Sequence, residues 1–262
     1  MHVSELFVYP VKGTAALPVT EAATCPTGFT DDRRWMIIDG AGRFISQRER
    51  RRLALLRSNV DDNTLELNAP GMPRLRIDDA RTGEPTVASI WTDEAQALRL
   101  PAHASEWVSD FLETDASIVY MPDTTRRDIQ PDYDRDSRIV SFADAFPFLL
   151  ISQESLDELN RRLDQPVEMI RFRPNIVVAG APAPHAEDGW KQVACGNVEF
   201  DVAKPCARCA VPTIDPSTAV MGKEPNRTLA TYRRFDGQVY FGQNLIHRNA
   251  GIIRVGDAVE VL

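Results

Sequence analysis

Two cysteines, Cys206 and Cys209, are the residues of this chain whose type and spacing most directly allow metal or redox chemistry. The thiolate form of cysteine is the nucleophile and the metal ligand, and neighbouring cations favour it. Lys204 and Arg208 stand beside this Cys-x-x-Cys pair. The segment therefore suits a zinc site, a redox-active thiol pair, or two ordinary buried cysteines.

The rest of the chain bears on these three alternatives. A structural zinc site needs two further ligands, but Cys25 and Cys195 are isolated and the histidines form no His-x3-5-His pair. A thioredoxin-like pair lies at the start of a helix, and Pro212 and Pro216 oppose a helix from Cys206 onward. From the residues alone, buried cysteines are the simplest interpretation, and the other two stay open.

Size and composition narrow the class of protein. With 262 residues the chain can form one large domain or two ordinary ones and bury a core without disulfides. Hydrophobic residues make up 43% and charged residues 26%, as in soluble globular proteins. The net charge of -8 opposes broad nucleic-acid binding, which needs a basic field, but it leaves room for a local basic pocket.

The sequence also bears on location. Met1–Leu6 contains no basic stretch followed by an apolar run, so we expect no secretory signal. No segment approaches the roughly 18 to 20 consecutive apolar residues that cross a bilayer. We therefore expect a cytoplasmic protein without a membrane partner, whose four cysteines are free thiols.

The first part of the chain has the pattern of a β-rich domain. Apolar residues recur at helical spacing only between His103 and Leu112, which predicts a helix there. The polar stretch Asp123–Ser137, with five Asp and three Arg, predicts a loop between two lobes. Short apolar runs bounded by glycine, proline or aspartate predict strands at Leu6–Tyr9, Arg34–Asp39, Phe44–Ile45, Leu65–Leu67, Ile90–Trp91 and Leu98–Leu100.

The second part begins with an apolar run and a helix. After Phe146–Ile151, Ser152 has the properties of a helix N-cap, with Leu156, Leu159 and Leu163 on one face. The last hundred residues have the pattern of a small β-barrel interrupted by a helix near residues 225–233. Three hairpins are predicted, at Gly196-Asn197, Asp236-Gly237 and Gly256-Asp257.

Five motifs, in order along the chain, resemble those of one family. The run Cys206–Pro216 is similar to the metal-ligand segment of MOSC proteins, a family that includes the mitochondrial amidoxime reducing component and bacterial relatives. Four further segments resemble motifs of the MOSC domain or of the β-barrel domain that precedes it: Tyr9–Lys12, Asp32–Trp35, Arg171–Ile176 and Phe241–Asn244. The resemblance implies an α+β, mostly β fold, with an N-terminal β-rich domain over residues 1–118 packed against a MOSC β-barrel over residues 119–262.

The resemblance also implies a cofactor. MOSC proteins of this kind bind the molybdenum cofactor (Mo-molybdopterin), whose metal takes one protein thiolate, a soft donor that such a centre accepts. The family's ligand is the second cysteine of the pair, here Cys209, and Cys206 is then expected to pack. Asp215 is a candidate catalytic residue that orients water or substrate, although a turn role before Pro216 explains it equally well.

The phosphate of the pterin requires a cationic pocket. By position in the motifs, the candidate cofactor-binding residues are Lys12, Arg33, Arg48, Asp144, Arg173 and Asn175. Arginine grips phosphate through two parallel donors, whereas lysine acts as a point charge. The amide of Asn175 could read the pterin's amide edge, and Asp144 could bond the pterin. The chain departs from its animal relatives at Ala145 and Phe146, where they carry hydroxyl residues.

The activity implied by the resemblance is the reduction of N-hydroxylated compounds such as amidoximes and hydroxylamines. The chain lacks the four-cysteine spacing of an iron–sulfur cluster, so a separate electron-transfer protein of iron–sulfur, flavin or b5 type is expected. Two alternatives stay open. One is a carrier or storage protein for the molybdenum cofactor, and the other is a sulfur carrier that holds a persulfide on Cys209.

Overall fold

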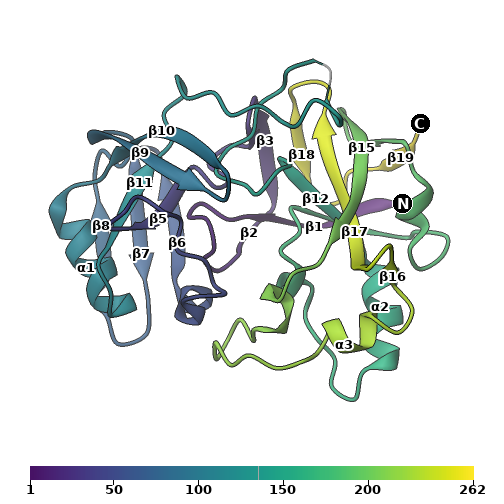
Figure 1. Ribbon diagram of the computed structural model, residues 1–262. Helices are drawn as coiled ribbons and strands as arrows, with labels where there is room; N and C mark the ends of the chain where they lie inside the picture. The colour runs from purple at the N-terminus through teal and green to yellow at the C-terminus, as the bar shows by residue number, and fades with distance from the viewer. Residues whose placement is uncertain (135) are drawn as a thin grey trace.

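The computed structural model describes residues 1–134 and 136–262. Short strands form four sheets, and the described residues contain three α-helices. Strands and helices gather in two lobes, with β5–β11 and α1 in one and β12–β19, α2 and α3 in the other (Figure 1). The predicted class, α+β and mostly β, is confirmed.

The lobe with α1, called the N-terminal lobe, contains two antiparallel sheets, a buried cluster formed mainly by strands of the larger sheet, and a core to which both sheets contribute. α1 covers Ala102–Leu112, as the helical spacing predicts, and its Trp107, Val108 and Phe111 are buried in this core. The four-stranded sheet has the order β5 (Trp35–Asp39), β11 (Ala116–Tyr120), β10 (Asp93–Arg99), β9 (Glu84–Ile90). The three-stranded sheet has the order β6 (Arg57–Asp61), β7 (Thr64–Asn68), β8 (Leu75–Ile77).

The other lobe, called the C-terminal lobe, is built on a nine-stranded sheet, in which only the neighbours β12 and β13 are parallel. Its order is β19 (Val259–Val261), β14 (Gln192–Cys195), β15 (Val198–Ala207), β17 (Gln238–His247), β12 (Phe148–Ser152), β13 (Ile176–Ala179), β1 (His2–Val8), β2 (Leu17–Val19), and β16 (Arg234–Phe235) pairs with β17. A small sheet has the order β18 (Ile252–Arg254), β3 (Glu21–Cys25), β4 (Gly28–Phe29).

The N-terminal residues therefore belong to the C-terminal lobe in space. β1 pairs with β13 and β3 pairs with β18, across more than half of the chain. The chain starts in this lobe, crosses to the other and returns. Strands from before residue 118 therefore belong to sheets of the C-terminal lobe, so a domain boundary at residue 118 divides the sequence but does not separate the sheets. The predicted division stays a prediction.

Two segments that meet at the junction of the lobes hold each other in place: residues 9–12, which follow β1, and residues 33–35, which lead into β5. Lys12 N donates to Trp35 O at 2.7 Å, and Arg33 N donates to Tyr9 O at 2.9 Å. Both segments thus run side by side at the junction of the lobes. This pairing brings two of the predicted cofactor-binding cations together, although they are far apart in the sequence.

Helix α2 (Gln153–Arg162) begins as predicted. The Ser152 hydroxyl accepts a hydrogen bond from Ser155 N at 3.2 Å, which satisfies one free backbone donor of the first turn. A fully buried carboxylate, Glu187 in the 3-10 turn Ala186–Gly189, accepts from Ser152 N and from the hydroxyls of Ser152 and Ser155. The start of α2 is therefore anchored by a residue to which no sequence pattern pointed.

Glycine at position 242 is required by the approach of two central strands. A Cβ atom there would lie 2.5 Å from Cγ1 of Ile151 and 2.8 Å from the Leu150 carbonyl oxygen, and its φ is +81°. The glycine of the Phe241–Asn244 motif thus has a packing role.

Four details differ from the sequence predictions. Phe44–Ile45, predicted as a strand, forms only an isolated bridge between Phe44 and Ile38. The hairpins at Gly196-Asn197 and Asp236-Gly237 are confirmed, but β18 and β19 do not pair with each other. Their turn is hydrogen-bonded to β1, through Gly256 N to Val3 O, so the two strands diverge to different sheets. Helix α3 covers only Asn226–Leu229, and Trp91 lies in the turn after β9 rather than in a strand.

The polar stretch 123–137 contains no helix or strand among its described residues, and Arg135 lies outside them. It is nevertheless well anchored, because Arg127 is buried and donates to Asp93 and to the carbonyl oxygens of Ser141 and Asp144. This loop thus supports the segment that carries Asp144.

Candidate functional site

Cys209 lies where the longest pair of strands ends. Cys206 is half-buried near the end of β15, and Cys209 is exposed in the loop that leads to the 3-10 turn Val211–Thr213. Arg208 N donates to Val239 O at 2.7 Å, and Asn226 Nδ2 donates to the Cys209 carbonyl oxygen at 2.7 Å. The backbone is therefore held on both sides of an accessible thiol.

The thiol segment lines a cavity of about 320 Å³ between the lobes. Seven of the eight predicted site residues line this cavity: Lys12, Arg33, Arg48, Asp144, Arg173, Asn175 and Cys209. Lys204 and Arg208 line it as well, so six basic side chains face one carboxylate there. The protein as a whole carries a net charge of -8, so the cavity is a local basic pocket suited to an anion.

Lys12 is buried at the inner wall of this cavity. Its ammonium lies 2.5 Å from Oδ1 of Asp144 and 4.7 Å from the centre of the Phe44 ring. Burial lowers the pKa of Lys12 to about 8, although Asp144 opposes the shift. Asp144 itself is exposed. Its packing opposes ionisation, but the neighbouring Lys12 ammonium holds its pKa below the ordinary value.

Arg33 and Arg173 lie over the same buried aromatic ring. The guanidinium carbons are 4.6 Å and 4.2 Å from the centre of the Tyr9 ring, at distances typical of cation–π contacts. Tyr9 is held by a hydrogen bond from its hydroxyl to Pro174 O at 2.9 Å. Arg33 also pairs with Asp32, and Arg173 Nη1 donates to Thr14 O at 2.5 Å. Both cations are therefore held in position before any ligand binds.

Three residues that line the same cavity have a strained backbone conformation. Arg33, Trp91 and Arg173 line it and have φ values of 53°, 56° and 60°. Such left-handed conformations are unfavourable for residues with a Cβ atom, and they persist where the surrounding structure enforces them, often at binding sites. Eight further non-glycine residues of the described chain have positive φ away from this cavity, so the strain by itself does not mark the site.

The amide of Asn175 is largely used within the protein. Its Oδ1 accepts from Arg33 Nη1 at 3.1 Å and from Leu149 N at 3.3 Å, and its Nδ2 donates to Phe7 O at 3.2 Å. The side chain is buried, with 1% of its surface exposed. The geometry therefore favours a positioning role for Asn175, in which it orients Arg33, over the predicted recognition of a pterin edge.

Several lining residues had no assigned role in the sequence predictions. Trp91 is half-exposed at the rim, where its indole N–H donates to Asp144 Oδ1 at 3.0 Å and Arg48 lies 4.3 Å from its ring centre. Phe44 meets Trp91 edge to face. The only sequence signal for this role was the tryptophan itself. The apolar residues before Trp91 favoured a strand there, so the sequence did not place it in an exposed turn.

Asp215 is the predicted site residue that does not line the cavity. Its Oδ2 accepts from Arg171 Nη2 at 2.7 Å, and its Oδ1 accepts from Ser217 N, Ser217 Oγ and Thr218 N. The Ser217 hydroxyl and the other donors lower the pKa of Asp215 to about 2. These contacts describe a side chain that caps the turn around Pro216, which is the structural alternative that the sequence left open.

The comparisons with known proteins identify the family. The MOSC domain matches residues 137–260, and the MOSC N-terminal beta barrel domain matches residues 1–115. Human mitochondrial amidoxime-reducing component 1 is 32% identical over 99% of this chain and 82% of its own length. The mouse protein of the same name is 34% identical over the same shares. Bovine mitochondrial amidoxime reducing component 2 is 32% identical over 98% of this chain and 82% of its length.

The chain belongs to the MOSC family. Within this MOSC protein, the division predicted at residue 118 falls between the two matched segments. The helices of the described residues are all too short or too polar to cross a membrane. The three relatives are named mitochondrial, and the cytoplasmic location remains a prediction.

The residues of the cavity fit a phosphorylated cofactor that takes a soft ligand. A thiol stands at one wall, and cations from both lobes can meet phosphate oxygens. Nε of Arg208 is buried and has no hydrogen-bond partner among the described residues, while Nη1 lies 3.1 Å from Sγ of Cys206. A buried guanidinium donor without a partner at the wall of a cationic cavity fits a site that takes an anionic ligand.

The zinc alternative has less support. Within residues 1–134 and 136–262, no three His, Cys, Asp or Glu side chains come together closely enough to hold a metal ion by themselves. A metal bound at Cys209 would therefore need most of its ligands from a cofactor. That requirement fits the molybdenum cofactor, which would bring sulfur ligands of its own.

Proposed function

We propose that this MOSC protein binds Mo-molybdopterin in the cavity between its lobes and reduces N-hydroxylated compounds. The relatives named amidoxime-reducing components support the substrate class. The observation that carries the proposal is the meeting of an accessible Cys209 with six cations in one cavity of an acidic protein.

The chain's own residues would bind and orient the cofactor. Arg33 and Arg173 are pre-positioned on Tyr9, so they lose little side-chain freedom when they meet a phosphate. Lys12 adds a point charge, and Arg48 and Trp91 cover the exposed rim. Cys209 would give its thiolate to the metal, while Cys206 packs beside Arg208.

The overall reaction is a two-electron reduction. An N-hydroxyl compound, two electrons and two protons give the N–H compound and water. The bound cofactor supplies the chemistry that removes the oxygen atom. The protein excludes water through aromatic walls and takes its electrons from a separate donor protein, for which we propose an iron–sulfur, flavin or b5-type protein. Five aromatic residues line the cavity: Phe44, Trp91, Phe146, Phe148 and Phe172.

The first experiment is molybdenum and pterin analysis of protein from a host that makes the cofactor, with wild type compared with Cys209→Ser. Cys206→Ser is the matched control, since it removes a thiol of the same cavity. We expect near-stoichiometric molybdenum in wild type and Cys206→Ser and its loss in Cys209→Ser. Equal amounts in all three, or none in any, would contradict the assignment of the ligand.

Turnover then separates the remaining alternatives. Reduction of hydroxylamine or benzamidoxime with a chemical reductant supports the reductase. Full cofactor content without turnover would instead support a carrier or storage protein. A sulfur atom on Cys209 that cyanide removes would support the sulfur carrier.

A further inference from the structure

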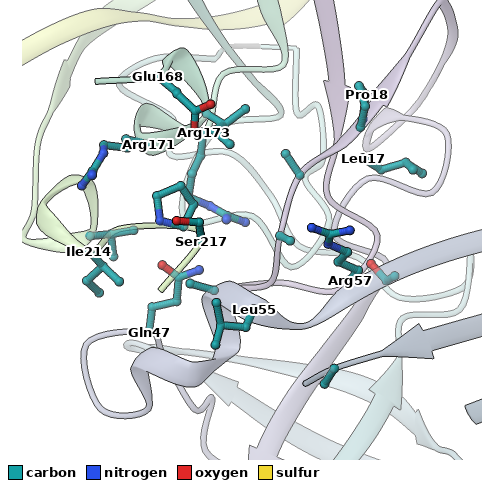
Figure 2. Close-up of a pocket in the computed structure, with 18 of the residues that line it drawn as sticks. Leu17, Pro18, Gln47, Leu55, Arg57, Glu168, Arg171, Arg173, Ile214 and Ser217 are labelled. Atoms are coloured by element: carbon teal, nitrogen blue, oxygen red, sulfur yellow. The ribbon is translucent and has the colours of Figure 1, made fainter. Parts of the chain in front are cut away.

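A second, larger cleft adjoins the cavity of Cys209. Its volume is about 790 Å³, and its walls come from both lobes (Figure 2). It shares Gln47, Arg173 and Val211 with the first cavity. Val211 stands two positions after Cys209, so a molecule in the cleft would have one end beside the thiol segment.

Twelve of the twenty residues that line this cleft are apolar, and the other eight are polar or charged. One wall is formed by the chain before and within β2 and by residues around β6 and β7, and the other by the segments around residues 170 and 214. Figure 2 shows Leu17, Pro18 and Arg57 on one side and Arg171 and Ile214 on the other. The apolar members are Ala15, Ala16, Leu17, Pro18, Ala54, Leu55, Ala69, Pro70, Ile170, Val211, Ile214 and Pro216.

The charged side chains nearest the thiol segment are already satisfied. Arg171 pairs with Asp215, and Arg173 is held by Tyr9 and Thr14. Arg57 and Glu168 are exposed, and no hydrogen bond or ion pair joins either side chain to another described residue. Arg57 and Glu168 offset each other and Asp215 neutralises Arg171, so the uncompensated charge among the described lining residues is that of Arg173, at the end shared with the Cys209 cavity. Away from that end the cleft has no net preference for a charged ligand.

The volumes of the cavity and the cleft indicate where the cofactor and the body of a substrate would fit. Pockets for small organic molecules have volumes of about 300–1,000 Å³. A cavity of about 320 Å³ is at the lower end of this range, so a bound cofactor would leave little room for the body of a substrate. The adjoining cleft of about 790 Å³ provides that room.

We propose that this cleft binds the non-reacting body of the substrate, and that the preferred substrates are N-hydroxylated compounds with an elongated, uncharged, apolar body. The inference rests on the proposed function, since the N-hydroxyl end would have to reach the Cys209 cavity past Gln47 and Arg173. Contacts of the body with the apolar wall supply binding energy away from the reacting group.

The test narrows the cleft by placing a larger side chain on its wall. Leu55 is half-exposed and belongs to none of the buried clusters of the described residues, so Leu55→Trp adds bulk without disturbing a core. Ile252→Trp, on the 40%-exposed Ile252 of β18, adds the same side chain away from the cleft and is the matched control. Thermal unfolding of both variants checks that they are folded.

Two substrates separate the cleft from the chemistry. Hydroxylamine has no body, whereas 4-hexylbenzamidoxime has an elongated apolar one. For the long substrate we expect Leu55→Trp to lower kcat/KM by about tenfold, the usual effect of losing an apolar contact. For hydroxylamine we expect no change, and the control variant should match wild type with both. Equal effects on both substrates, or no effect on either, would overturn the proposal.

Binding is measured without turnover as well. The holoprotein is titrated calorimetrically with 4-hexylbenzamide, which has the same body, is uncharged and has no N-hydroxyl group. We expect binding to wild type that is weakened about tenfold in Leu55→Trp. If wild type reduces neither substrate but binds the benzamide in this way, the cleft assignment is supported and the proposed activity is wrong. If it reduces hydroxylamine but does not bind the benzamide, the activity is supported and the cleft assignment is wrong.

Discussion

Arg33 donates a hydrogen bond from Nη1 to Oδ1 of Asn175 across 142 positions of the chain, with a length of 3.1 Å. Arg33 lies on the segment that crosses between the lobes, and Asn175 comes directly before β13 of the nine-stranded sheet. The bond therefore couples the position of a cavity cation to the central sheet. This coupling and the geometry around it lead to four predictions.

Replacement of Asn175 by alanine tests its positioning role. The change leaves Leu149 N–H and Phe7 C=O without the side-chain partners they now have, and a buried group left unpaired costs about 1–3 kcal/mol. We expect the free energy of unfolding in urea to fall by about 2 kcal/mol. The affinity for phenyl phosphate should fall as well, because Arg33 loses the hydrogen bond that positions its guanidinium. Unchanged phosphate affinity in a destabilised variant would show that Arg33 needs no such partner.

Lys12 should make anion binding pH-dependent. Its pKa is lowered to about 8 by burial, with Asp144 opposing the shift and Arg127 and Arg33 adding to it. Since a base loses its charge above its pKa, the affinity for phenyl phosphate should fall roughly tenfold as the pH rises from 7 to 9. The ligand's second ionisation, with a pKa of about 6, is nearly complete there.

Two variants check the assignment to Lys12. Lys12→Met should bind more weakly at pH 7 and show no step near pH 8, because it has no group to titrate. Lys12→Arg keeps its charge and should retain binding up to pH 9. A step that survives in Lys12→Met would place the titration on another group.

Asp215 should behave as a turn cap. Asp215→Asn keeps an Oδ1 acceptor for Ser217 and Thr218, so we expect cofactor content and turnover close to wild type. Asp215→Ala removes the acceptors and should lower the free energy of unfolding by about 1–2 kcal/mol. Loss of turnover in Asp215→Asn at full cofactor content would restore the catalytic role.

The pKa of Asp215 adds a pH signature. It is lowered from 3.8 to about 2 in the folded protein, so between these values the unfolded chain binds more protons. The stabilisation is complete above pH 4 and is lost as the pH falls from about 4 to about 2. The difference in stability between wild type and Asp215→Ala should shrink over that interval, as acid titration of the unfolding midpoint can show.

Glu187 should be needed for stability and not for the site. Replacement by alanine removes the acceptor of Ser152 N and of two hydroxyls in a fully buried place. We expect a loss of about 3 kcal/mol in the free energy of unfolding, and a smaller one for Glu187→Gln, which keeps one oxygen. Phenyl phosphate binding should not change. A variant as stable as wild type would mean that water replaces the carboxylate.

Local sequence patterns predicted the elements that depend on local interactions. Helix α1, the Ser152 cap of α2 and two of three hairpins follow from residue spacing, capping and turn chemistry, which act within a few positions. The prediction of a hairpin at Gly256-Asp257 was wrong because this turn is hydrogen-bonded to β1, at the other end of the chain.

The chemistry of the site also had its signal in the sequence. Two cysteines beside two cations indicated thiolate chemistry, and the family motifs pointed to residues that the structure places around one cavity. What the motifs lack is the direction of each side chain. Asp215 turns to its own loop, Asn175 is occupied by its neighbours, and Trp91 completes the rim although no motif contains it.

The sequence by itself thus determined the family, the residue types of the site and most local elements, because these depend on composition and short-range spacing. The tertiary structure alone decided that Lys12 meets Asp144 across 132 positions, that β1 and β3 join the C-terminal lobe, and that a second cleft adjoins the cavity of Cys209. Such contacts depend on how sheets pack and strands pair over long separations, and no short stretch of sequence specifies them.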